Sequence, residues 1–200
     1  MYGRVFAVGD IHGSFSHLKS LIDYLQPNDT DLWVFLGDYV DRGPQTREVI
    51  DLLLKLSERT TCVFLRGNHE VMLLAAIPKA GSDRSFWLKF GGQAVLASYG
   101  LTADQTPLKF PREHLRFLQD TEPLFEYRRS ETECYIFAHA SHDPSQGTED
   151  WSDDVLYWNR PLSTPHRSGA LFEDQPLPQR GFCSIRAAVY RMGSYRPSIC

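Results

Sequence analysis

Apolar residues in the first half of the chain follow two alternating patterns. Three short runs, at residues 4–8, 32–36 and 61–65, are rich in Val, Phe and Leu and are closed by a nearby glycine, which is typical of strands. After each run, apolar residues recur every third or fourth position, which is typical of amphipathic helices. The order β-α-β-α-β-α predicts an α/β fold that begins with a parallel sheet.

Local residue types indicate where the predicted helices begin. Ser14 suits the N-cap of the first helix, and Pro44 suits the first turn of the second. The third helix is expected over residues 71–77. Each strand would therefore be joined to its helix by a loop, and the loops at the carboxyl ends of parallel strands share one edge of the sheet.

Side chains with metal-binding chemistry stand in all three of these loops. Asp10 and His12 follow the first run, Asp38 follows the second and Asn68 follows the third. This mixture of carboxylate, imidazole and amide oxygen suits borderline metals better than magnesium. We therefore predict two divalent ions, manganese in the first place with iron or zinc as alternatives, and hydrolysis at phosphorus.

Two arginines and an acid–imidazole pair add functions that a phosphate-ester site needs. Arg42 and Arg66 carry planar guanidinium groups that can bind phosphate oxygens in bidentate fashion. Asp41 could hold His69 as an imidazolium that protonates the leaving alkoxide. Any one of these residues is more often a turn, surface or core residue, but three motifs in order, each after a strand, make coincidence a poor explanation.

The runs Gly-Asp-Ile-His, Gly-Asp-Tyr-Val-Asp-Arg-Gly and Arg-Gly-Asn-His-Glu resemble the signature of the calcineurin-like metallophosphoesterases, and within them the phosphoprotein phosphatase family. The resemblance implies a sandwich of two mixed β-sheets flanked by helices. It implies that Asp10 and His12 bind the first metal, that Asp38 bridges both and that Asn68 binds the second. It also implies the remaining roles: phosphate binding by Arg42 and Arg66, and proton donation by the Asp41–His69 pair.

The resemblance continues in the second half of the chain. Residues 86–100 resemble the bacterial members of the family. His139 follows an apolar run, and the resemblance implies that it is a further ligand of the second metal. Arg160 stands in a segment similar to the Trp-x-Arg element that supplies another phosphate-binding arginine.

The motifs also bear on the substrate. With Asp41 and Glu70 in them, the second and third motifs resemble those of the serine/threonine protein phosphatases of bacteria and phages. They resemble those of the symmetrical dinucleoside tetraphosphatases less, because these usually carry other residues at both positions. The resemblance implies hydrolysis of phosphoserine and phosphothreonine in proteins by direct attack of a metal-bound hydroxide. A symmetrical dinucleoside tetraphosphatase or another phosphoesterase is the alternative.

The resemblance stops near residue 169. The family pattern calls for a strand ending in Gly-His-Thr, and the chain contains no Gly-His pair. We expect a phosphatase domain over residues 1–168 and an irregular tail over 169–200, in which the closing strands are missing or altered. Divergence, truncation or a shifted reading frame would explain such a tail, and we favour the last. A catalytically impaired remnant is therefore a rival hypothesis.

Composition and charge indicate which partners and which cellular compartment to expect. The chain has 200 residues, enough for one domain, and a formal net charge of −4, with basic residues scattered along it. We therefore expect phosphoprotein substrates and no nucleic acid or membrane partner. Four cysteines without a Cys-x-x-Cys pair, and a first strand too early for a signal peptide, predict a cytoplasmic protein, which we expect to be a monomer.

Overall fold

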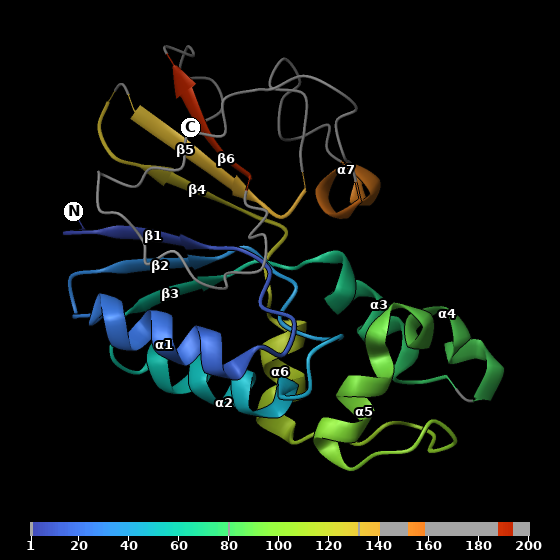
Figure 1. Cartoon of the computed structure of the whole chain (residues 1–200). Coiled ribbons are helices and arrows are strands. Elements are labelled where there is room, and N and C mark those ends of the chain that lie inside the picture. Colours follow the sequence, from blue (N-terminus) through green and yellow to red (C-terminus); the bar gives the residue numbers. More distant parts are fainter. Residues whose placement is uncertain (1, 80, 132, 141–151, 159–187, 194–200) are drawn as a thin grey trace.

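Two three-stranded sheets face each other, and helices cover the outer face of one of them (Figure 1). This computed structural model describes residues 2–79, 81–131, 133–140, 152–158 and 188–193. Over these residues the predicted α/β sandwich flanked by helices is confirmed. The sheets as described are not mixed, because one is parallel and the other antiparallel.

The first sheet contains the three strands expected from the apolar runs. The strands β1 (Val5–Val8), β2 (Leu32–Phe35) and β3 (Thr61–Phe64) are parallel and pair in the order β1-β2-β3. Helices α1 (Phe15–Leu25) and α2 (Thr46–Ser57) lie below this sheet in Figure 1. The central strand β2 is buried along its whole length because the helices cover one face and the second sheet covers the other.

The second sheet is antiparallel and includes part of the tail. Its strands β4 (Leu124–Arg128), β5 (Glu133–Ala138) and β6 (Ala188–Gly193) pair in that order. One strand, β6, thus lies within residues 169–200, the tail in which the sequence predicted closing strands to be missing or altered. By pairing with β5, β6 provides partners for backbone N–H and C=O groups that would otherwise form an open edge. The rest of this tail lies outside the described residues.

Alternate residues of β2 point into two separate cores. Leu32 and Val34 pack against Phe137 of β5, between the two sheets. Trp33 and Phe35 point the other way and pack against the helices. Because successive side chains of a strand alternate between faces, a single apolar run serves both cores.

Two predicted helix starts were wrong. Helix α2 begins at Thr46, not at Pro44. Helix α3 (Asn68–Ala76) begins before residue 71, because a carboxylate oxygen of Glu70 accepts a hydrogen bond from the N–H of Gly67 (2.9 Å) and closes the first turn early. Asn68 therefore lies at the start of a helix and not in a free loop. Ser14 precedes α1 as predicted, although its side chain makes no capping hydrogen bond.

Further helices cover the right-hand side of the molecule in Figure 1. Among the described residues, every helix is too short or too polar to span a membrane. The remaining helices are η1 (Gly81–Arg84), α4 (Ser85–Trp87), the π-helix η2 (Leu88–Gly92), α5 (Gln93–Tyr99), α6 (Arg112–Gln119) and α7 (Asp153–Tyr157).

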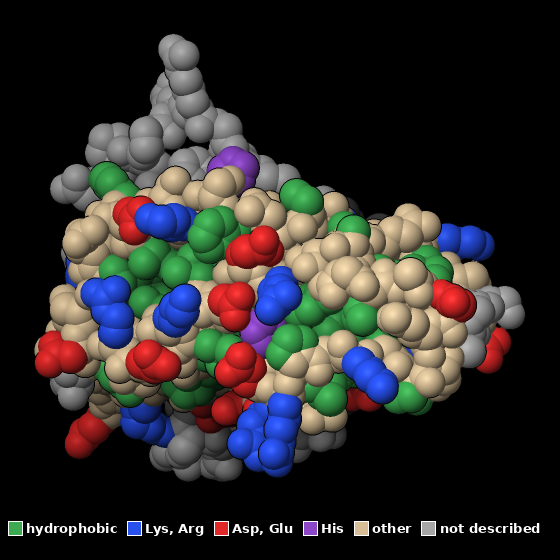
Figure 2. Space-filling model, turned by 90° about the horizontal axis from the view of Figure 1, so that it is seen from below, with side chains coloured by type: hydrophobic (Ala, Val, Ile, Leu, Met, Phe, Trp, Pro, Cys, Tyr) green, Lys and Arg blue, Asp and Glu red, His purple; other side chains and the backbone are tan. Residues whose placement is uncertain are grey.

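Charged side chains of both signs are interspersed over the face seen from below. In Figure 2 the Lys and Arg side chains lie beside Asp and Glu side chains and alternate with small hydrophobic areas. The described part of this face therefore carries no continuous positive patch of the kind that binds nucleic acid.

Candidate functional site

Polar side chains from the ends of β1, β2 and β3 meet at one edge of the first sheet, and His139 joins them from the end of β5. Asp38 lies at the centre, with its Oδ2 3.5 Å from His12 Nε2 and its Oδ1 3.6 Å from His139 Nε2. His12 Nε2 is also 3.9 Å from Asp10 Oδ2, and His139 Nε2 is 3.1 Å from Asn68 Oδ1. The structure thus brings together the five side chains that the sequence assigned to metals.

Four non-glycine residues of these loops have left-handed backbone conformations. The φ angle is 45° at His12, 56° at Asp38, 68° at Asp41 and 64° at Arg42. Hydrogen bonds between the loops hold this geometry: the N–H of His12 donates to the carbonyl oxygen of Asp38 (2.8 Å), and the N–H of Gly43 donates to that of His12 (3.1 Å). Such conformations are costly for L-residues and cluster at functional sites, so the site is built at the expense of backbone strain.

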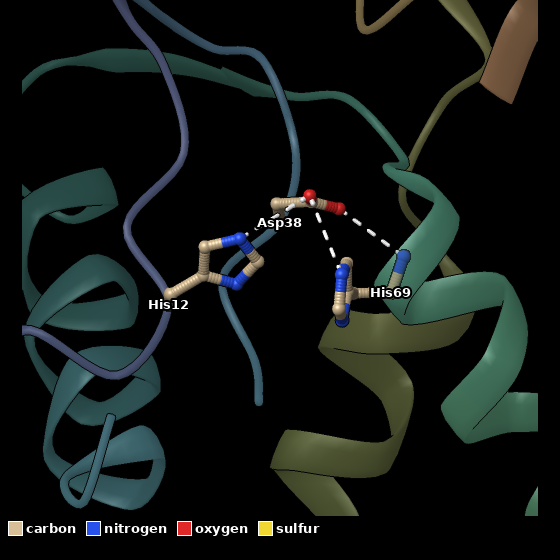
Figure 3. Close-up of side chains that lie close together, drawn as sticks. All are labelled: His12, Asp38 and His69. Atoms are coloured by element: carbon tan, nitrogen blue, oxygen red, sulfur yellow. Dashed lines mark hydrogen bonds and ion pairs between the residues drawn. The ribbon is translucent and has the colours of Figure 1, made fainter. Parts of the chain in front are cut away.

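His12 presents a free lone pair to the centre of the site. Its Nδ1 donates to the carbonyl oxygen of Val40 at 2.8 Å, which leaves Nε2 unprotonated in the neutral ring. This Nε2 is buried and has no hydrogen-bond partner among the described residues. Figure 3 shows it pointing toward Asp38, with His69 on the other side. A cation between His12 and Asp38 would satisfy both atoms, so this pair fits a metal.

His139 supports a cation position on the other side of Asp38. Its Nδ1 donates to the carbonyl oxygen of Leu36 at 2.9 Å, and its Nε2 then faces Asn68 Oδ1 at 3.1 Å. Two lone pairs in this position repel each other unless a cation lies between them or Asn68 turns its amide nitrogen toward the ring. The donor set therefore fits a second metal.

Asp38 belongs to two groups of possible ligand atoms, one with His12 and His69 and the other with Asp10 and His139. Within each group the ligand atoms all lie within 4.8 Å of one another. A carboxylate that is shared in this way can bridge two cations. Burial raises the pKa of Asp38 to about 7, and the neighbouring Asp10 adds to the rise. Burial lowers the pKa of His12 to about 4, which keeps the ring in the neutral form that binds metals.

We expect manganese to raise the melting temperature of the protein more at pH 8 than at pH 6. The metal competes with the proton on Asp38, whose pKa of about 7 leaves the carboxylate mostly protonated at the lower pH. Tighter binding to the folded state gives greater stabilisation. Thermal melts with and without manganese would measure this, with Asp38→Asn as the control that removes the shift. Equal shifts at both pH values would contradict the expectation.

His69 and Asp41 form a buried pair beside Asp38. His69 Nδ1 lies 2.6 Å from Asp41 Oδ2, and His69 Nε2 lies 3.1 Å from Arg42 Nη2 and 4.0 Å from Asp38 Oδ2. Burial raises the pKa of Asp41 to about 7, while Trp87 and Arg42 oppose the rise. The pair can carry a proton next to the candidate metal ligands. The sequence predicted these two residues as the proton donor.

Glu70 binds the backbone of the Asp38 loop through both of its carboxylate oxygens. Its side chain is fully buried. One carboxylate oxygen accepts hydrogen bonds from the backbone N–H groups of Asp38 (2.8 Å) and Gly67 (2.9 Å), and the other accepts from those of Tyr39 (2.9 Å) and Val40 (3.3 Å). Any effect of Glu70 on substrate preference must therefore pass through the position of this loop.

Trp87 is a neighbour of the site that sequence reasoning missed. Its indole Nε1 donates a hydrogen bond to Asp41 Oδ1 at 2.8 Å, across 46 residues of sequence. The similarity of residues 86–100 to bacterial phosphatases pointed to this segment but gave no role for the tryptophan. No local spacing could have given one, because the contact depends on how α4 packs against the Asp41 loop.

The three predicted phosphate-binding arginines differ in their placement. Arg42 points its guanidinium at the His69 ring, next to the candidate metal ligands. Arg66 instead donates to the side chain of Thr121 (2.9 Å) and to the carbonyl oxygens of Gln119 (2.7 Å) and Thr121 (2.9 Å). Arg160 lies outside the described residues. Phosphate binding by all three stays a prediction.

Comparisons with known proteins identify relatives of the chain. The chain matches the calcineurin-like phosphoesterase family over residues 3–169. It is 33% identical over 171 residues to serine/threonine-protein phosphatase 1 of Salmonella typhimurium, covering 83% of this chain and 73% of that protein. The symmetrical bis(5'-nucleosyl)-tetraphosphatase of Pseudomonas syringae is 40% identical over 77 residues, which are 38% of this chain and 25% of that protein.

The fold of the chain is also found in a solved structure. A protein provisionally assigned as a diadenosine tetraphosphatase superposes with a TM-score of 0.53 and 22% identity. The superposition covers 76% of this chain and 57% of that one, so the chain spans little more than half of its length. This likeness concerns the arrangement of the sheets and helices.

Proposed function

Because the chain belongs to the calcineurin-like phosphoesterase family, we propose that it is a metal-dependent phosphatase that hydrolyses phosphoserine and phosphothreonine in proteins. The observation that carries this proposal is the buried His69–Asp41 pair beside the Asp38 cluster. The similarity to a serine/threonine-protein phosphatase over 83% of the chain supports the choice of substrate. A cytoplasmic monomer acting on phosphoproteins is the setting that we propose.

Two divalent cations would be held by the ligands around Asp38. Manganese suits this donor set, and iron or zinc are alternatives. When bound, such cations lower the pKa of water and offset the charge of the phosphate. The ligands that fit this role are Asp10, His12, Asp38, Asn68 and His139.

The remaining steps belong to Arg42, His69 and Asp41. The Arg42 guanidinium, now hydrogen-bonded to His69 Nε2, is free to turn its planar fork toward a phosphate. Once Arg42 has turned away, His69 Nε2 can carry a proton, and the Asp41 carboxylate stabilises the imidazolium through Nδ1. From there the Nε2 proton passes to the leaving oxygen of serine or threonine.

A second candidate function keeps this chemistry and changes the substrate. The identity to the Pseudomonas syringae tetraphosphatase, 40% over 77 residues, favours a dinucleoside polyphosphate as that alternative. Its short span, 38% of the chain, makes it the weaker proposal.

A competition assay with manganese separates the candidates. Equal concentrations of a phosphoserine peptide and of diadenosine tetraphosphate would be offered to the whole chain, with bound metal counted in parallel. We expect faster hydrolysis of the peptide. Faster cleavage of the tetraphosphate would overturn the protein phosphatase assignment, and hydrolysis of neither substrate would favour the impaired remnant.

Replacing His69 by asparagine should separate substrates by their leaving groups. A general acid contributes about 10²-fold or more to rate, but only where the leaving oxygen needs a proton. The kcat for a phosphoserine peptide should therefore fall about 10²-fold, while that for p-nitrophenyl phosphate should fall much less. His17, an exposed histidine on α1, provides the matched control His17→Asn. Equal losses on both substrates would argue against proton donation by His69.

A further inference from the structure

We propose that Trp87 is a positioning residue for the proton donor, fixing the Asp41 carboxylate so that its second oxygen holds His69. This inference rests on the proposed function, since it concerns how the leaving group receives its proton. It assigns a role to a side chain on α4, outside the three loops that carry the candidate ligands.

The Asp41 carboxylate is held at both oxygens. Oδ1 accepts the indole N–H of Trp87 at 2.8 Å, and Oδ2 lies 2.6 Å from His69 Nδ1. Asp41 is fully buried and Trp87 is 2% exposed, so water does not compete for either bond. With only one bond the carboxylate could rotate about its Cβ–Cγ axis, whereas two donors on different oxygens fix its plane and hence the direction of the His69 ring.

The segment that carries Trp87 also holds the backbone of the next residue in the loop. The carbonyl oxygen of Gly91 accepts a hydrogen bond from the N–H of Arg42 at 3.2 Å. Gly91 has a φ of +110°, and a Cβ there would lie 2.6 Å from the Arg42 nitrogen. A Cβ on Gly92 would lie 2.4 Å from the indole ring of Trp87. Glycine at both positions lets η2 approach the Asp41–Arg42 loop closely enough for the indole to reach the carboxylate.

The Trp87 hydrogen bond is not a general requirement for burying a tryptophan in this fold. Trp33 on β2 is also fully buried, yet its Nε1 has no hydrogen-bond partner in the described part of the chain. Trp33 therefore supplies a matched control, since Trp33→Phe removes an indole N–H from the same core without touching Asp41. Both substitutions remove an indole N–H from a buried tryptophan, but only Trp87→Phe removes a donor to Asp41.

Leaving-group dependence tests the role of Trp87. The readout is the ratio of kcat/KM for p-nitrophenyl phosphate, whose leaving group needs no proton, to that for phenyl phosphate, whose leaving group does. A misdirected donor costs about 10-fold or more in the proton-dependent reaction, so Trp87→Phe should raise this ratio about 10-fold. Trp33→Phe should leave it unchanged. A ratio that is unchanged in Trp87→Phe, or raised as much in Trp33→Phe, would overturn the inference.

The double variant shows whether Trp87 acts through Asp41. In an Asp41→Asn background the ratio is already raised, and adding Trp87→Phe should raise it no further. A further 10-fold rise would mean that Trp87 affects the reaction by another route, which would also overturn the inference.

A spectroscopic measurement keeps the inference testable apart from the proposed function. The chain has four tryptophans, and the indole N–H resonance lost in Trp87→Phe identifies Trp87. That resonance should move upfield in Asp41→Asn, because a neutral amide is a weaker acceptor than a carboxylate. If the parent chain hydrolyses no phosphate ester but the resonance moves, the proposed function fails and the contact stands. If the resonance does not move, the contact fails whatever the activity.

Discussion

Replacing Asp38 by asparagine is expected to lower kcat for phosphate-ester hydrolysis by about 10³-fold or more. Asp38 is the one side chain common to the two ligand groups that contain Asp10, His12, His69 and His139. A neutral amide cannot bridge two cations as a carboxylate can. The loss of metal-based charge stabilisation would raise the activation free energy by several kcal/mol. Manganese-dependent hydrolysis of p-nitrophenyl phosphate, with bound metal counted, measures the effect.

Asp31 provides the control for this prediction. It is as buried as Asp38 but is bound to Arg4, whose Nη2 lies 2.6 Å from its Oδ2, away from the candidate ligands. Asp31→Asn should cost stability and keep both the metal count and the turnover per folded molecule. Robust turnover by Asp38→Asn would refute the two-metal proposal.

Asp38→Asn should lower activity but raise the stability of the metal-free protein above neutral pH. Burial raises the pKa of Asp38 to about 7, above the value of about 4 expected for an unfolded chain. The contribution of the protonated Asp38 side chain to stability is therefore fully present below the unfolded pKa, and it is lost as the pH rises through about 7. Asparagine resembles the protonated acid at every pH. Without metal, Asp38→Asn should melt above the parent at pH 8, and the difference should vanish toward pH 4.

Replacing Glu70 by glutamine is expected to destabilise the protein by about 3–5 kcal/mol, because one acceptor oxygen becomes a donor that faces two buried N–H groups, and each buried group left unpaired costs about 1–3 kcal/mol. In the parent, those groups belong to the backbone of Gly67, Asp38, Tyr39 and Val40. For a chain of this length the loss corresponds to a fall of about 10 °C in melting temperature. Activity should fall as well, since the Asp38 loop loses its support.

Thermal melts of Glu70→Gln, together with manganese-dependent activity at a temperature where it is folded, check both parts. Glu58, an exposed residue at the end of α2, supplies the control Glu58→Gln, which should melt like the parent. A Glu70→Gln protein with the parent's melting temperature would contradict the role of this carboxylate as the support of the loop.

The sequence predicted much of the fold and of the candidate site because the relevant signals are local. The strands β1, β2 and β3 appear within one residue of the predicted runs at each end. Parallel pairing then brings Asp38 and Asn68 to the same edge of the sheet. Helix starts were less well predicted: Pro44 stands before α2, since capping depends on contacts with other segments.

Other roles could not be read from the sequence. The sequence predicted that Arg66 binds phosphate but gave no sign that its guanidinium also donates hydrogen bonds to Thr121 and to the backbone of Gln119. The sequence predicted no role for Trp87, yet its indole N–H donates a hydrogen bond to Asp41. In both cases the partner lies more than 40 residues away along the chain, where residue types and periodicity carry no information about distance.

By itself the sequence determined the order of strands and helices. It also determined that oxygen and imidazole side chains able to bind metals follow the strands, because hydrophobic period and loop position are properties of neighbouring residues. Only the tertiary structure decided that Asp38 is shared between two ligand groups, and that Glu70 holds the backbone of its loop while Trp87 holds the side chain of Asp41. These assignments depend on which atoms meet when sheets, loops and α4 pack, and a buried polar group takes its role from the partner that packing brings within hydrogen-bonding distance.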